Sequence, residues 1–162
     1  MKNFSKNRRN FLIFSSISTL VFFAGCSNEV DLSPRKVHFD RDVCDRCKMV
    51  ISVKNYVAQV INPKDGKHYN FDDIGCAVNW FKEKEIEWEN EAVIYIADAD
   101  TSEMIDARKA FYVDGANSPM DFGFAAYKNS QYERENFGYE QVKIRLLEIA
   151  DEKKKSMSHN KH

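Results

Sequence analysis

The alternation of apolar and polar residues predicts a β-hairpin early in the chain. Residues 56–61 form an apolar, β-branched run, and residues 67–71 follow as a second, shorter run. Between them, residues 62–66 carry the turn-forming sequence Asn-Pro-Lys-Asp-Gly. Two such runs joined by a turn are typical of antiparallel strands.

A helix and a third strand are predicted after the hairpin. Asp72 or Asp73 provides an N-cap, and residues 74–81 then place apolar side chains three and four positions apart. Cys76 lies inside this helix, where a free cysteine usually packs as a small apolar residue. Residues 92–97 form a buried strand, which completes a ββαβ unit.

Four further elements in the same order are predicted for the second half of the chain. They are two short strands, a helix and a long strand, at residues 110–113, 122–127, 129–136 and 142–149. Two similar ββαβ halves, at residues 37–97 and 110–150, indicate an internal duplication. The predicted fold class is therefore α+β, in one compact domain.

The segments between and after the halves lack apolar periodicity. Residues 98–109 are predicted to be a solvated connector, because their acidic residues do not have the spacing of an EF-hand calcium loop. Residues 151–162 combine Lys, His and Met without apolar positions that could dock them. We expect this segment to be a mobile tail.

The first 25 residues have the pattern of an export signal. Four basic residues and no acidic residue surround the start of an apolar run at residues 11–24, which is too short to span a membrane. Phe23-Ala24-Gly25-Cys26 resembles a lipobox, in which Cys26 receives a lipid and becomes the first mature residue. Residues 26–36 would then form a polar tether. Ordinary secretion, with Cys26 as a structural thiol, is the alternative.

Export and charge narrow the class of function. The paired Arg8-Arg9 also fits a twin-arginine signal, so the export route stays open. Removal of the signal leaves 20 basic residues against 25 acidic ones. Nucleic-acid binding is not expected, because it needs clustered Lys and Arg side chains and the chain offers only Lys153-Lys154-Lys155. The pattern predicts a membrane-anchored lipoprotein that faces the periplasm.

The stretch Cys44-Asp45-Arg46-Cys47-Lys48-Met49 gathers two thiols and a thioether. In an extended segment Cys47 and Met49 would share one face. Cu(I) accepts thiolate and thioether sulfur, whereas Zn(II) has little use for a thioether, so the pattern favours copper. If Cys26 carries lipid, three thiols remain, and a disulfide from Cys44 to Cys47 or Cys76 is the alternative.

The chain also resembles the NosL family, copper-binding lipoproteins that accompany nitrous oxide reductase. The resemblance covers most of the mature chain and rests on the order and spacing of several short motifs. These are Cys47-x-Met49, Gln59, Asp65-Gly66, Phe71-Asp72-Asp73-Ile74-Gly75-Cys76, Ile105-Asp106-Ala107, Ala110-Phe111-Tyr112-Val113 and Pro119-Met120.

The resemblance implies two similar ββαβ halves, distantly related in fold to an organomercurial lyase, and one bound Cu(I). It implies Cys47, Met49 and Met120 as ligands, while Cys44 adds a thiol that many family members lack and His38 is a further reachable donor. The implied role is copper delivery to nitrous oxide reductase, in company with its copper and maturation transporter complex.

No catalytic constellation accompanies the sulfur-rich stretch. The sequence has no recognisable Ser/His/Asp arrangement, no Gly-rich phosphate loop and no His-Glu-x-x-His helix, so we do not expect an enzyme. The alternative is a thiol-disulfide redox lipoprotein that uses Cys44 and Cys47. Such a pair normally sits at a helix N-terminus, whereas this one precedes a strand.

Overall fold

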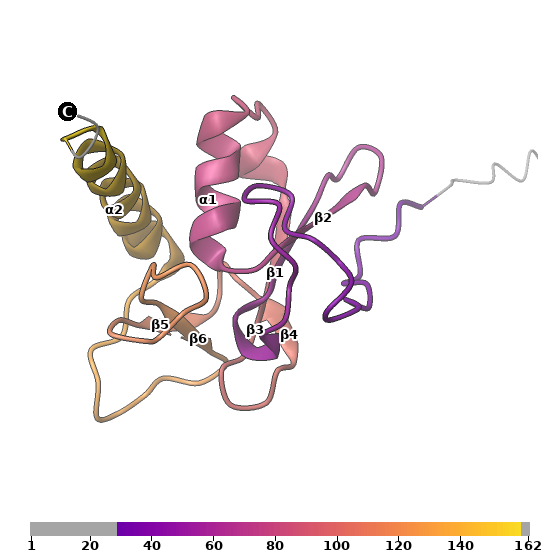
Figure 1. Cartoon of the computed structure of the whole chain (residues 1–162). Coiled ribbons are helices and arrows are strands. Elements are labelled where there is room, and N and C mark those ends of the chain that lie inside the picture. Colours follow the sequence, from indigo (N-terminus) through magenta and orange to yellow (C-terminus); the bar gives the residue numbers. More distant parts are fainter. Residues whose placement is uncertain (1–28, 160–162) are drawn as a thin grey trace, which may run out of the picture.

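The computed structural model describes residues 29–159, so the predicted export signal, Cys26 and the last three residues lie outside the described part of the chain. The described residues form a mixed α+β domain with two antiparallel sheets and two α-helices (Figure 1). Among them, no helix combines the length and the apolar character needed to cross a membrane.

The larger sheet has four strands in the order β2-β1-β3-β4. Its strands are β1 (Ala58–Ile61), β2 (His68–Phe71), β3 (Val93–Ala97) and β4 (Met104–Asp106). The central strand β1 is buried on both faces, which explains its continuous apolar sequence. Two short 3-10 helices, η1 (Lys54–Tyr56) and η2 (Glu89–Glu91), precede β1 and β3. The predicted hairpin and third strand are confirmed.

The prediction of a solvated connector at residues 98–109 is wrong in part, because this segment contains β4. Ile105 pairs with Ile96 of β3 and is 8% exposed. One apolar residue between polar neighbours gives too weak a signal for a strand, and the open edge of β3 supplies the missing backbone partners.

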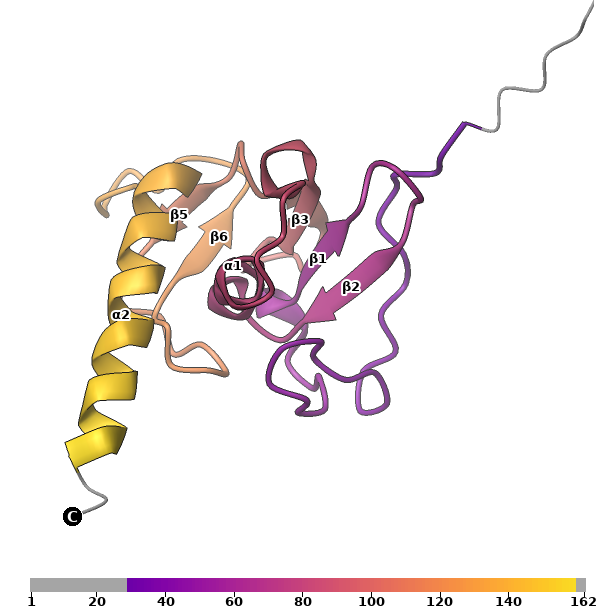
Figure 2. The same cartoon turned by 90° about the horizontal axis from the view of Figure 1, so that it is seen from above.

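Helix α1 (Ile74–Glu83) lies between the larger sheet and the second helix (Figures 1 and 2). The carboxylate of Asp73 accepts a hydrogen bond from the Gly75 N–H at 2.7 Å, so the predicted N-cap is present. Every residue from Ile74 to Phe81 is buried. The central position of the helix explains this burial on all sides.

The second sheet is a two-stranded ribbon of β5 (Phe111–Val113) and β6 (Ala125–Tyr127). The strand predicted at residues 122–127 is therefore shorter than expected. Tyr112 anchors the ribbon: its side chain is fully buried, and its hydroxyl donates to the Ala107 carbonyl at 2.8 Å. Its backbone also exchanges two hydrogen bonds with Phe137.

The helix predicted at residues 129–136 is wrong, because this segment is a loop. The Asn136 side chain holds it: its amide donates to the Gln131 and Arg134 carbonyls, each at 2.8 Å, and its oxygen accepts from the Gln131 N–H at 2.8 Å. Such side-chain hydrogen bonds compete with helical ones.

The strand predicted at residues 142–149 is also wrong, and the segment belongs to helix α2 (Tyr139–His159). Tyr139, Val142, Leu146 and Ala150 are buried at spacings of three and four residues, which is the stripe of a helix. α2 extends into the predicted tail, so residues 151–159 are helical. The second half therefore has the order ββα.

Gly75 is a point where the two halves meet, and its replacement tests this packing. A Cβ atom at Gly75 would lie 2.2 Å from Cγ of Phe122. Gly75→Ala is expected to lower the free energy of unfolding by about 1–3 kcal/mol, because the aromatic ring must move within a packed core. Urea unfolding measures this. In the control Gly138→Ala, the new Cβ meets only Oε1 of Gln141, at 4.0 Å. Equal losses in the two variants would contradict the close packing.

Candidate metal centre

The cysteine-rich stretch folds as a tight turn, and the prediction of an extended segment is wrong. The Cys44 N–H donates to the Met49 carbonyl at 2.8 Å, and the Lys48 N–H donates to the Cys44 carbonyl at 3.0 Å. Lys48 adopts a left-handed conformation with φ of 64°. A turn does not alternate side chains between two faces, so the geometric reason for pairing Cys47 with Met49 is lost.

The turn is held against β2 by a reciprocal contact. The Asp45 N–H donates to the Asn70 carbonyl at 2.8 Å, and the Asn70 N–H donates to the Asp45 carboxylate at 2.8 Å. Because β2 leads directly into α1, this contact brings Cys44 beside the first turn of the helix that carries Cys76.

Three cysteine side chains meet at this junction. The sulfur atoms of Cys44, Cys47 and Cys76 all lie within 4.8 Å of one another. Cys44 and Cys76 are fully buried, Cys47 is half-buried, and all three are free thiols in the structure. Soft thiolate ligands in this arrangement suit Cu(I) or Zn(II).

The sequence favours Cys76 as a small core residue over a ligand; in the structure its side chain is fully buried, and its sulfur also completes the three-thiol cluster. The sequence offered one signal for this role. Three thiols remain if Cys26 carries lipid, and an unpaired thiol outside the cytoplasm calls for a ligand or a partner. The spacing along the chain does not show which cysteine joins the pair at Cys44 and Cys47.

The environment of the cluster favours a thiolate at Cys44. A hydrogen bond from the Cys76 thiol lowers the pKa of Cys44, and backbone N–H groups of Asp72, Cys47 and Arg46 lower it further. The same interaction with Cys44 raises the pKa of Cys76, whereas burial is the largest cause of the raised pKa of Cys47. Since a metal binds the thiolate form, the lowered pKa favours Cys44 as a ligand.

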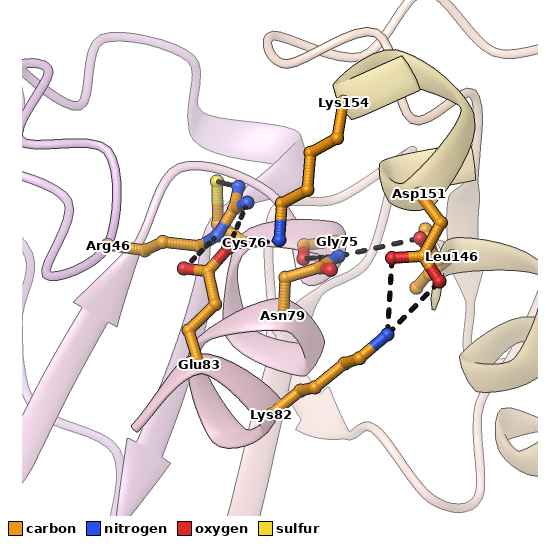
Figure 3. A network of polar contacts seen from close by, with 9 residues as sticks. All are labelled: Arg46, Gly75, Cys76, Asn79, Lys82, Glu83, Leu146, Asp151 and Lys154. Atoms are coloured by element: carbon orange, nitrogen blue, oxygen red, sulfur yellow. Dashed lines mark hydrogen bonds and ion pairs between the residues drawn. The ribbon is translucent and has the colours of Figure 1, made fainter. Parts of the chain in front are cut away.

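Arg46 brings a positive charge to the edge of the cluster. Its Nη1 lies 3.9 Å from the Cys76 sulfur, while its Nε and Nη2 donate to the two carboxylate oxygens of Glu83 at 3.1 and 2.9 Å (Figure 3). The Arg46 side chain is only 18% exposed. A guanidinium held in this way offsets part of the negative charge of a metal–thiolate complex.

Figure 3 also shows how α1 and α2 are joined next to the cluster. Asn79 donates from its side-chain amide to the carbonyls of Gly75, at 2.8 Å, and Leu146, at 3.4 Å. Lys82 of α1 pairs with Asp151 of α2 at 3.2 Å. These contacts hold the helix that carries Cys76 in place from the side opposite the turn.

A buried carboxylate lies next to Cys44. Asp72 is 4% exposed, and its Oδ1 has no hydrogen-bond partner among residues 29–159. Burial and the adjacent Cys44 thiolate raise the pKa of Asp72 to about 6. The charged form of this carboxylate therefore destabilises the metal-free fold.

Asp72→Asn is expected to stabilise the metal-free protein more at pH 8 than at pH 5. The pKa of Asp72 is about 6 in the folded state and about 3.9 in an unfolded chain, so its contribution to stability falls as the pH rises through this window. Removing the charge is expected to add about 1–3 kcal/mol to the free energy of unfolding at pH 8. Urea unfolding at both pH values measures the difference, with the exposed Asp100→Asn as control. A gain that is equal at both pH values would contradict this account.

The structure places two of the other predicted ligands on the surface. Met49 is 53% exposed. His38 is also exposed, and its Nδ1 lies 3.6 Å from the carboxylate of Asp42. His38 is not a member of the cluster formed by the three cysteines.

Met120 is half-buried. It lines a cavity of about 200 Å³ together with Arg46, Phe122 and Lys153. The Lys153 ammonium donates to the Met120 carbonyl at 2.9 Å. Ligation of a metal by Met49 or Met120 stays a prediction.

Comparisons with known proteins match this chain to a family by its sequence and to a solved structure by its fold. The sequence profile of the NosL family matches residues 36–141. The fold is similar to the crystal structure of the copper chaperone NosL from Shewanella denitrificans, with a TM-score of 0.55 and 14% sequence identity over 68% of this chain and 95% of that chain. At this identity the likeness concerns the fold alone. No match was found among curated proteins.

Proposed function

We propose that this chain, which belongs to the NosL family, is a metallochaperone that carries one Cu(I) ion on Cys44, Cys47 and Cys76. It would be exported, lipidated at Cys26 and held on the periplasmic side of the membrane. Its cargo would serve the assembly of the copper centres of nitrous oxide reductase, together with the copper and maturation transporter complex of that enzyme.

The observation that carries this proposal is the cluster of three thiols within 4.8 Å. Cu(I) is stable with two or three soft sulfur ligands, whereas structural Zn(II) sites have four ligands. Among residues 29–159, no histidine or carboxylate belongs to the group of ligand atoms that lie within 4.8 Å of one another, although the Asp72 carboxylate lies next to Cys44. The donor set therefore suits Cu(I) better than Zn(II).

The different exposure of the three thiols suits delivery. Cys44 and Cys76 are fully buried and shield the ion from water, whereas Cys47 is half-buried and faces the surface. A donor from the receiving protein can approach at Cys47 and replace its sulfur. The ion then passes by ligand exchange without release as free copper. Met49 is exposed on the same turn, and as a predicted ligand it would be a further sulfur donor during this exchange.

A carrier fits the cluster better than a thiol-disulfide enzyme does. A redox thiol must be both ionised and accessible to its substrate. Here the thiol with the lowered pKa, Cys44, is fully buried, while burial raises the pKa of the accessible Cys47. Neither Cys44 nor Cys47 lies at a helix N-terminus. We therefore infer that the chain is not an enzyme.

The two hairpin–helix units, β1-β2-α1 and β5-β6-α2, support the proposed internal duplication. Each unit is an antiparallel pair of strands followed by a helix. The predicted likeness to an organomercurial lyase remains part of the same proposal.

Metal competition tests the proposed cargo. A soluble form that starts after Cys26 is expected to bind about one Cu(I) per chain in competition with a colorimetric Cu(I) chelator, and to keep it in the presence of excess Zn(II). Cys47→Ser is expected to weaken binding more than Met49→Leu, because a thiolate brings a charge that a thioether lacks. Preferential binding of Zn(II), or an unchanged affinity in Cys47→Ser, would overturn the assignment.

A further inference from the structure

The segment predicted as a free tether is bound to the larger sheet. The Ser33 carbonyl lies 2.9 Å from Nε2 of His68, and the backbone of Arg35 exchanges two hydrogen bonds of 2.9 Å with the side chain of Gln59. Gln59 is 1% exposed. Residues 30–36 are therefore part of the domain and not a spacer.

The contacts of this segment show in which direction it runs along the sheet. Val30 packs against Gly66 so closely that a Cβ atom there would lie 2.8 Å from Val30 Cγ1. Further along, Ser33 contacts His68 in β2. The segment thus enters beside the β1–β2 turn and runs along β2 toward the end that holds the thiol cluster (Figure 2).

The covalent distance to the proposed anchor is short. Three residues lie between Cys26 and Val30, so four residue steps place the lipidated residue at most about 14 Å from the point where the segment meets Gly66. Val30 lies at the β1–β2 turn, whereas the cysteine turn contacts Asn70 at the opposite end of β2, so the chain that leads to Cys26 leaves the domain at the end that does not hold the cluster. From Gly66 to Asn70, which contacts the cysteine turn, an extended chain covers about 13 Å.

We infer that the β1–β2 turn, residues 62–67, faces the lipid headgroups and that the three-thiol cluster is held at the end of the domain away from the membrane. This inference rests on the proposed lipid at Cys26. It deepens the proposed function, because copper would be exchanged with a partner domain that projects into the periplasm and not with one embedded in the bilayer.

The charges at this end of the domain do not explain such an orientation. The exposed lysines of the turn, Lys64 and Lys67, are opposed by Glu29, Asp31 and Asp65. With nearly balanced charge, attraction to anionic headgroups is small. The short bound segment would set the orientation, and it should be the same at low and high salt.

Paramagnetic broadening tests the orientation. The full-length protein is produced in cells, recovered from membranes in lipid nanodiscs that contain a gadolinium-chelating headgroup, and examined by amide NMR. Signals of residues 62–67 are expected to lose most of their intensity, and those of Cys44, Cys47 and Cys76 to keep most of theirs. The pattern is expected to be unchanged at high salt.

A matched pair of insertions tests the role of the short segment. A flexible Gly/Ser insertion of about ten residues between Asn28 and Glu29 should spread the broadening evenly over the surface, because the domain can then tumble. The same insertion after Lys161 should leave the original pattern.

Strongest broadening at the cysteines, even broadening in the unmodified chain, or no effect of the first insertion would overturn the inference. Recovery of the protein in the soluble fraction would overturn the anchor and the orientation with it. Copper stoichiometry on the same nanodiscs reports separately on the proposed function, since the orientation does not depend on the bound ion.

Discussion

Replacement of Cys76 by serine is expected to lower Cu(I) affinity by about 100-fold or more, which corresponds to about 3 kcal/mol. The Cys76 sulfur lies within 4.8 Å of both other thiols and is fully buried, so its removal leaves the cluster with two thiols. A hydroxyl is a harder and less acidic donor than a thiol, and it does not form a comparable bond to Cu(I). Chelator competition under anaerobic conditions measures the affinity.

The control for this experiment is Ala77→Ser, which adds a hydroxyl to the next buried position of α1. It is expected to retain the affinity of the unmodified chain if the loss in Cys76→Ser comes from the missing sulfur. X-ray absorption gives a second readout, because the number of sulfur ligands per copper should fall from three to two. If Cys76→Ser binds as tightly as the unmodified chain, with an unchanged sulfur count, Cys76 is only a core residue.

Loss of this protein from its host is expected to leave the amount of nitrous oxide reductase polypeptide unchanged but to deplete its copper. Cells should then accumulate nitrous oxide under denitrifying conditions, most sharply when copper is scarce. The physical reason is that a carrier raises the local concentration of copper at the reductase, where the ion would otherwise arrive slowly. Copper per reductase in the purified enzyme is the deciding measurement.

Complementation of the deletion strain links this effect to the thiol cluster. Cys76→Ser should fail to restore the copper content although it is produced and exported, whereas Ala77→Ser should restore it. Added copper should rescue the deletion in part. A fully metallated reductase in the deletion strain at limiting copper would show that the chain serves a different target.

The first half of the fold could be predicted because its signals are local. The apolar run of β1, the turn at residues 62–66 and the carboxylate cap at Asp73 each act within a few residues of the element they specify. The observed strands and helix follow these signals closely. The turn at the cysteine-rich stretch was missed, and so was β4 in the connector that follows, because each depends on contacts with residues distant in the chain.

The second half shows the limit of local signals. Residues 142–149 contain Val142, Ile144 and Ile149, and β-branched side chains favour a strand. The same segment also carries a helical stripe through Val142, Leu146 and Ala150. Packing of α2 against α1 selects the helix, and it leaves Ile144 59% exposed.

The sequence by itself determined the chemistry of the site, because donor softness is a property of each side chain and Cys44 and Cys47 are close along the chain. The membership of the cluster was decided only in the tertiary structure. Cys76 joins it, and Arg46 reaches its edge, because the reciprocal contact between Asp45 and Asn70 closes the turn onto β2. That contact joins residues far apart in the chain, and its geometry exists only once the sheet and α1 have packed together.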